Sequence, residues 1–282
     1  MKIERVDVSK TYVNDLKRVL DNLRPTMSNI VDGVQGKDIN SIKEIIIFKD
    51  KKKLSKHVQK DRYSEIRSVV DESDRADTHF AKRGYIFLKT SDPKSYLHDH
   101  IIIEEFIHAL TEITDDERVF FDFIDLVDKK VGFHIPYVAM KLWNKSKEAV
   151  EHYYTFTLFK KYSPTRIVAQ LNKDLNTKFK QISNHIRSMN HNPIIIAFYF
   201  PAFVLGDIFD IETEERIVEN YRKEYERVKN ALFRLSIDDL QKEGYMLIKE
   251  ICEIQLSMCL GELKKTSPRF LSDSRTRTLI SL

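Results

Sequence analysis

The sequence is poor in the two residues that shape tight turns. Seven glycines and seven prolines occur among 282 residues, and this is too few for the many turns of an all-β protein. No segment repeats along the chain, and no glycine-rich loop of the phosphate-binding kind is present. These absences argue against an all-β or repeat architecture and against a nucleotide-binding phosphate loop.

Neither sign of charge prevails. The chain has 47 Lys and Arg against 43 Asp and Glu, a formal net charge of +4, which is far from the basic excess of a nucleic-acid binder. Even the most charged stretch, residues 51 to 75, interleaves acids with bases and carries only a thin apolar stripe. It is expected to form a solvated helix. The composition therefore argues against nucleic acid as a partner.

Cysteine is scarce and no apolar run has membrane length. Cys252 and Cys259 lie seven residues apart on one expected helix face, an arrangement typical of packing residues in a reducing compartment and not of a disulfide. The first ten residues lack the apolar segment of a signal peptide. The most apolar stretch, residues 193 to 206, is too short to span a bilayer and contains Pro201. The sequence thus predicts a cytoplasmic protein without a membrane segment.

Apolar residues make up 42% of the chain, and in the first half they mark two strands. Residues 43 to 48 and 84 to 89 are apolar runs rich in β-branched or aromatic side chains. A loop after the second strand leads into an apolar helix that ends near residue 113. Near the N-terminus, residues 9 to 23 have helical spacing, and Pro25 is expected to end that helix.

Beyond residue 118 the pattern is helical throughout. Helices are expected over residues 137 to 162, 165 to 189, 193 to 209 and 213 to 235, with a further helix after Ser236. The expected fold class is α+β, with a small sheet and its helices in residues 1 to 164. A helical extension, residues 165 to 282, packs on that core.

The helix before residue 113 concentrates ionisable groups in an apolar setting. Glu104 and His108 are one turn apart and face the same way, and Glu105 is offset by about 100°. A carboxylate and an imidazole at this spacing can reach one divalent cation, while the neighbouring carboxylate can accept a proton from a polarised water. The His-Glu-x-x-His zinc helix uses the same arrangement.

A third metal ligand has to come from another element. The helix over residues 137 to 162 places Glu148, Glu151, His152 and Thr155 on one face, at offsets 0, 3, 4 and 7. If this helix packs across the first, Glu148, Glu151 or His152 can complete the site. The spacing alone does not choose among the three.

The order of two apolar strands, an acidic-histidine helix and a downstream Glu-bearing helix resembles the zincin-like metallopeptidases. The gluzincin-type branch, which includes phage-immunity and radiation-response regulator peptidases, is the most similar in this order. The resemblance covers residues 43 to 164 and implies a bound zinc ion. It also implies a peptide or protein as substrate or partner, and a second strand that borders the substrate cleft.

Carried onto this sequence, the resemblance implies a role for each motif residue. Glu105 would be the general base of a hydrolase and His108 a zinc ligand. Glu151 or Glu148 would be the third ligand, and Glu104 stands where the family has His.

Three other interpretations stay open. The chain can be a catalytically inactive zincin-like module that binds a partner protein, since the first ligand position is altered. The acidic and histidine side chains can form a polar network that only joins two helices. Glu105-x-x-His108 also matches the helix motif of di-iron carboxylate bundles, although two strands fit a bundle poorly.

Overall fold

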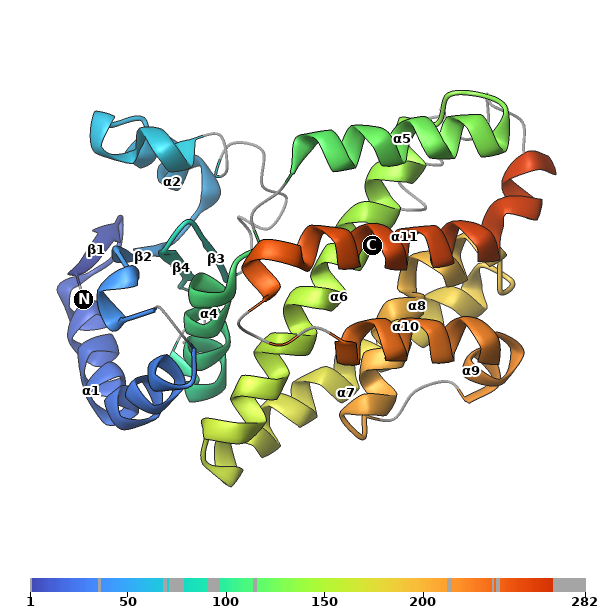
Figure 1. The fold of residues 1–282 in the computed structure, drawn as a ribbon. Coiled ribbons are helices and arrows are strands. Elements are labelled where there is room, and N and C mark those ends of the chain that lie inside the picture. Colours follow the sequence, from blue (N-terminus) through green and yellow to red (C-terminus); the bar gives the residue numbers. More distant parts are fainter. Residues whose placement is uncertain are drawn as a thin grey trace. The chain divides into compact units, whose positions relative to one another are not determined.

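The computed structural model is α+β, as the sequence predicts, with a mostly helical C-terminal half (Figure 1). It divides into two compact units. The first comprises Met1–Glu112 and Tyr154–Leu171, and the second comprises Ile113–Tyr153 and Asn172–Leu282. This division differs from the expected boundary after residue 164: the two long helices over residues 136–162 and 165–188 are each divided between the units. The structure describes residues 2–34, 37–67, 70, 79–90, 97–113, 116–211, 215–234, 236 and 239–265.

The first unit is built on a sheet whose described strands have the order β1-β2-β4-β3. Strands β1 (Lys2–Val6), β2 (Glu44–Phe48) and β4 (Tyr85–Lys89) run parallel, and β3 (Phe80–Lys82) pairs antiparallel with β4. Helix α1 (Lys10–Asp32) connects β1 to β2. The two strands that the sequence predicts are β2 and β4, and both are confirmed.

Side chains alternate between the two faces of this sheet, because successive residues of a strand point in opposite directions. Ile46 and Phe48 of β2 and Phe87 of β4 share one face with Leu54 and Tyr63 in a buried cluster. The elements on this face are α2 (Lys51–Val58) and the 3₁₀ helix η2 (Asp61–Ile66). Figure 1 shows α2 on this side of the sheet and α1 on the other.

The charged stretch after β2 differs from the solvated helix that its composition predicts. Residues 51 to 66 form α2 and η2, and the apolar side chains Leu54, Val58 and Ile66 are fully buried. Asp50 starts α2 by accepting a hydrogen bond from the backbone N–H of Lys53 at 2.9 Å. The thin apolar stripe therefore covers one face of the sheet. The rest of the predicted helix, apart from Arg67 and Val70, lies outside the described residues.

The prediction that Pro25 ends the first helix is wrong. Helix α1 continues through Pro25 to Asp32. Proline removes one N–H bond and crowds the preceding turn, but Met27 and Ile30 are buried beyond it. Their burial holds the chain in the helical path, and Gly33 follows as the C-cap.

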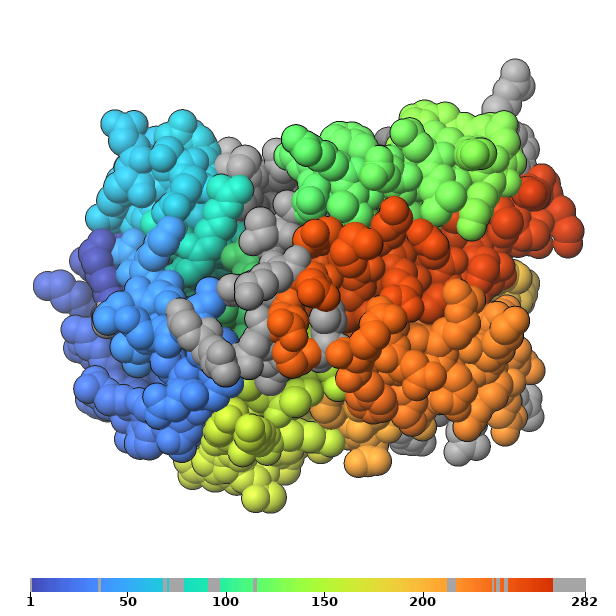
Figure 2. Space-filling view, in the orientation of Figure 1, coloured from blue at the N-terminus to red at the C-terminus, as the bar shows by residue number. Residues whose placement is uncertain are grey.

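The second unit consists of helices. They are α5 (Glu117–Val131), most of α6 (Pro136–Tyr162), α7 (Thr165–Ser188), α8 (Pro193–Ile208), α9 (Glu215–Asn220), α10 (Arg222–Arg234) and α11 (Leu240–Lys265). Residues 165–171 of α7 belong to the first unit. Figure 2 shows α5, α11 and α10 side by side on the surface of this unit.

The predictions for these helices are confirmed for α6, α7 and α8. Helix α8 continues through Pro201. The single helix expected over residues 213 to 235 is instead two helices, which are interrupted at Tyr221. Both cysteines are buried with free thiols, as expected of packing residues. No helix in the described part of the chain has the length and apolar character needed to cross a membrane.

Candidate metal centre

The metal-type helix is α4 (Asp99–Thr111), which begins after His98 and carries Asp99 in its first turn. Asp99 lies 3.5 Å from the guanidinium of Arg166, and a negative charge at a helix N-terminus is favourable. Ile102, Phe106 and Ile107 are fully buried, so apolar packing fixes the helix. Glu104, Glu105 and His108 are only partly buried.

The C-terminal end of α4 is attached to the β3–β4 turn. Glu112, the C-cap residue, accepts a hydrogen bond from the backbone N–H of Arg83, and its carboxylate lies 2.8 Å from the ammonium of Lys82. Arg83 and Gly84 both have positive φ and form the two-residue turn. These contacts hold the helix that carries Glu104 and His108 against the edge of the sheet.

The second helix of the candidate site is α6. Its start is fixed by Pro136 in the first turn and by Asp128, which accepts a hydrogen bond from the backbone N–H of Ile135 at 3.0 Å. The division between the two units falls inside α6, between Tyr153 and Tyr154. His152 is therefore on the same unbroken helix as Thr155, which belongs to the first unit.

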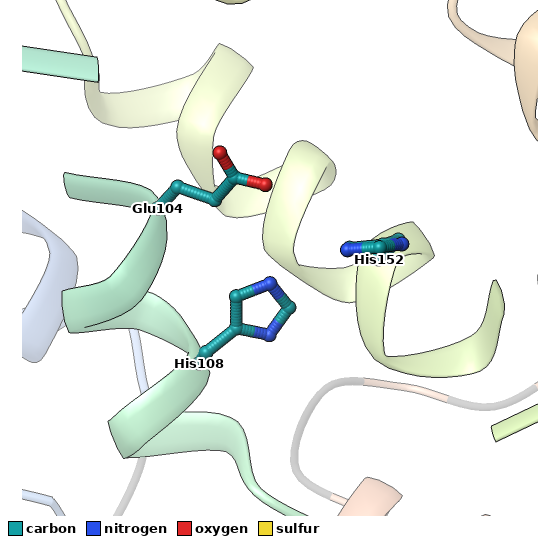
Figure 3. A group of neighbouring side chains, drawn as sticks. All are labelled: Glu104, His108 and His152. Atoms are coloured by element: carbon teal, nitrogen blue, oxygen red, sulfur yellow. The ribbon is translucent and has the colours of Figure 1, made fainter. Parts of the chain in front are cut away.

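Three predicted site residues come together as one group. Glu104 and His108 of α4 and His152 of α6 each offer one ligand atom, and these atoms all lie within 4.8 Å of one another. Figure 3 shows the carboxylate of Glu104 and both imidazole rings directed toward a common space. A group of this composition and size can hold a metal ion. Of the three candidates for the third ligand, the structure thus groups His152 with α4.

Glu148 and Glu151 are not members of this group. The carboxylate of Glu148 accepts a hydrogen bond from Lys145 at 3.0 Å, and that of Glu151 lies 4.0 Å from the ammonium of Lys147. Lys145 also stands over the ring of Tyr199 in α8. Burial, with a further contribution from the negative charge of Glu148, raises the pKa of Tyr199 to about 12. Lysines of the same helix therefore engage both glutamates.

Glu105 occupies the position that the zinc-helix pattern gives to the general base. It follows Glu104 directly, so helical geometry places it about 100° around α4 from the first donor. Its side chain is partly buried, and Phe106 beside it is fully buried.

The donor set differs in charge from the one expected with Glu151. Glu104 with Glu151 and His108 would give two carboxylates and one imidazole. The observed group has one carboxylate and two imidazoles, which is the His₂Glu composition of catalytic zinc sites. The lower negative charge would make water on a metal held there more acidic.

Comparisons with known proteins give no family for this chain: no family model matches it, and neither a curated protein nor a solved structure is significantly similar.

Proposed function

We propose that Glu104, His108 and His152 bind one zinc ion and that the protein is a hydrolase acting on peptide bonds. The observation that carries this proposal is the convergence of the three donors from two helices. A structural zinc site normally has four protein ligands, whereas a catalytic site has three and leaves one position open. Among the described residues the group has three members, which fits the catalytic kind.

The setting of the group fits a divalent metal. All three donors are partly buried, and their helices are fixed by buried neighbours such as Ile107 and Val150. Acceptor groups held close together repel one another until a cation or protons neutralise them. The same two-histidine, one-carboxylate set also serves iron(II) in oxygenases. Glu105 favours zinc and hydrolysis here, because an adjacent carboxylate supplies the base that a hydrolase needs.

The roles of the chain's own residues follow from the helix geometry. Zinc, when bound, supplies a Lewis acid that makes water more acidic and polarises the substrate carbonyl. Glu105 accepts the proton of the attacking water and later transfers it to the leaving amine. Glu104, His108 and His152 serve as ligands.

Two other functions compete with this one. A protein-binding module that keeps the zinc-helix geometry without catalysis would not require the carboxylate of Glu105. A di-iron centre would require two Glu-x-x-His motifs and two further glutamates. The described residues offer one group of three donors, and that favours a single ion.

The test combines metal analysis with one substitution. Protein purified without chelators is assayed for zinc and iron, and its hydrolysis of a mixed peptide library is followed by mass spectrometry. We expect one zinc per chain and measurable hydrolysis. Glu105→Gln should keep the metal and lower the rate by about 10²- to 10⁴-fold, the usual contribution of a general base.

The outcomes separate the candidate functions. Hydrolysis that Glu105→Gln abolishes while zinc remains bound supports the proposal. Zinc without hydrolysis of any library peptide favours the binding module. Failure to bind zinc at micromolar concentration, with no change in melting temperature on titration, would refute the metal centre and with it the hydrolase.

A further inference from the structure

Thr155 is a polar partner of His108 outside the three-donor group. Its hydroxyl oxygen Oγ1 lies 3.4 Å from the ring nitrogen Nδ1 of His108. Thr155 is on α6, one turn after His152, and its side chain is fully buried. In Figure 3 one ring nitrogen of His108 faces Glu104 and the other faces away from it.

A neutral imidazole can offer only one of its two nitrogens to a metal. The other nitrogen carries the proton, and the hydrogen bond that it makes decides which nitrogen is which. Ligand histidines usually donate this second N–H to an oxygen acceptor, which fixes both the tautomer and the orientation of the ring.

We propose that Thr155 is a positioning residue for His108: its Oγ1 accepts a hydrogen bond from Nδ1–H and leaves Nε2 as the ligand atom. This inference rests on the proposed metal centre and adds a residue that acts on the metal only through His108. It also gives α6 a second connection to the site, since the helix supplies both a ligand and the acceptor that orients another ligand.

The surroundings of Thr155 fix its hydroxyl in place. Tyr154 and Phe156, its neighbours in the chain, are also buried, so the backbone at this position has little freedom. A buried hydroxyl requires a hydrogen-bond partner, and the imidazole of His108 is one within reach. At 3.4 Å the contact is long for a hydrogen bond, and its value lies in orientation more than in energy.

The first experiment reads the tautomer directly and does not depend on metal. ¹⁵N chemical shifts of His108 in the metal-free protein should show Nδ1–H with an unprotonated Nε2. If Thr155 instead donated the hydrogen bond to Nδ1, the ring proton would be on Nε2. Observation of that tautomer in the wild-type protein would overturn the proposal.

The second experiment measures zinc affinity in three variants. Thr155→Val removes the acceptor while nearly keeping the shape, and we expect zinc binding to weaken by about 10- to 100-fold. Thr155→Ser keeps the hydroxyl and should bind zinc within about threefold of the wild-type affinity.

Thr111→Val is the matched control. Thr111 is also buried, and its hydroxyl donates to the backbone oxygen of Ile107 at 2.9 Å, so this substitution removes a buried hydroxyl that bonds to the backbone and not to the ring of His108. Equal zinc affinity of Thr155→Val and the wild type would overturn the positioning role while leaving the metal centre intact. Absence of zinc binding by the wild type would instead refute the proposed function.

Discussion

Gln255 of α11 donates a hydrogen bond from its side-chain amide to the backbone oxygen of Ala197 in α8, at 2.6 Å. In a regular helix that oxygen would accept from the N–H four residues later, but the residue there is Pro201, which has none. The oxygen of Gln255 in turn accepts a hydrogen bond from the hydroxyl of Ser146 in α6. One buried side chain thus compensates for the proline and joins three helices of the second unit.

Replacement of Gln255 should destabilise the second unit. In Gln255→Leu the carbonyl of Ala197 loses its side-chain donor and the hydroxyl of Ser146 loses one of its partners, and an unsatisfied buried group costs about 1–3 kcal/mol. We expect a fall in the free energy of unfolding of about that size, measured by urea denaturation with the fluorescence of Trp143 as the probe.

Pro201→Ala provides the control for this interpretation. It restores a backbone N–H that can bond to Ala197, so Gln255→Leu should cost less in that background, with a coupling free energy of about 1 kcal/mol or more. Additive effects of the two substitutions would show that Gln255 does not compensate for Pro201.

Gly84 should tolerate alanine less well than Gly132, although both have positive φ. At Gly84, with φ of +76°, an added Cβ would lie 2.6 Å from the backbone oxygen of Ser41, whereas at Gly132, with φ of +96°, it would meet nothing within 4 Å. Left-handed backbone costs an alanine about 1–2 kcal/mol, and Gly84→Ala adds steric overlap of about 1–3 kcal/mol.

Amide hydrogen exchange can measure the loss of stability caused by each substitution in the part of the structure that contains it. Exchange in β2 and β4 reports on Gly84→Ala, and exchange in α5 reports on Gly132→Ala. Equal losses of protection free energy would contradict the steric part of the prediction.

The sequence predicts the strongly patterned elements of this fold. The apolar runs of β2 and β4 and the 3.6-residue spacing of α6, α7 and α8 identify these elements without further information. Strand β1, with the sequence KIERV, was not expected, because it is short, charged and only partly buried. Strand β3 has three residues and offers no period to detect. The continuation of α1 past Pro25 depends on burial of Met27 and Ile30, which is a tertiary effect.

The candidate site was predictable in part. Spacing on α4 identifies Glu104 and His108 as donors that share a face. Spacing on α6 does not choose among the candidates, because all three side chains lie on the same face of the helix. These candidates are Glu148, Glu151 and His152. The ion pairs of Lys145 with Glu148 and of Lys147 with Glu151 help to distinguish them. Thr155 lies on the predicted face, but no local pattern connects it with His108.

The two buried thiols should be unreactive in the folded protein. Burial raises the pKa of Cys259 to about 12 and raises that of Cys252 as well. For Cys259, the rise in pKa from 9.0 to about 12 lowers the thiolate fraction near pH 8 by roughly a thousandfold. We expect no reaction with a disulfide reagent at pH 8 under native conditions and reaction of two thiols per chain in denaturant.

The same pKa shifts predict loss of stability in alkali. Both thiols ionise more readily in the unfolded chain, where the pKa is near 9.0. Their contribution to stability is therefore complete below pH 9 and is lost as the pH rises from 9 toward 12. Cys252→Ala combined with Cys259→Ala should flatten that part of the curve of unfolding free energy against pH. An unchanged slope would assign the loss to other groups.

The choice between His152 and Glu151 as third ligand has a direct test. His152→Ala removes one of three donors and should weaken zinc binding by more than roughly 100-fold. Loss of a residue that only hydrogen-bonds to a metal ligand already weakens binding by about 10- to 100-fold, and loss of the ligand itself should cost more. Glu151→Ala removes a carboxylate that lies 4.0 Å from Lys147 and is outside the group. It should leave zinc affinity unchanged, although stability falls because Lys147, with a side chain only 12% exposed, loses its ion pair.

Thermal denaturation with and without zinc separates the two effects. Zinc at 100 times its Kd stabilises a protein that binds it only when folded by about 2.7 kcal/mol. Glu151→Ala should keep that zinc-dependent increase in melting temperature from a lower starting value, whereas His152→Ala should start near the wild-type value and lose the increase. The reverse pattern would make Glu151 the ligand and would require α6 to rotate relative to α4 when the metal binds.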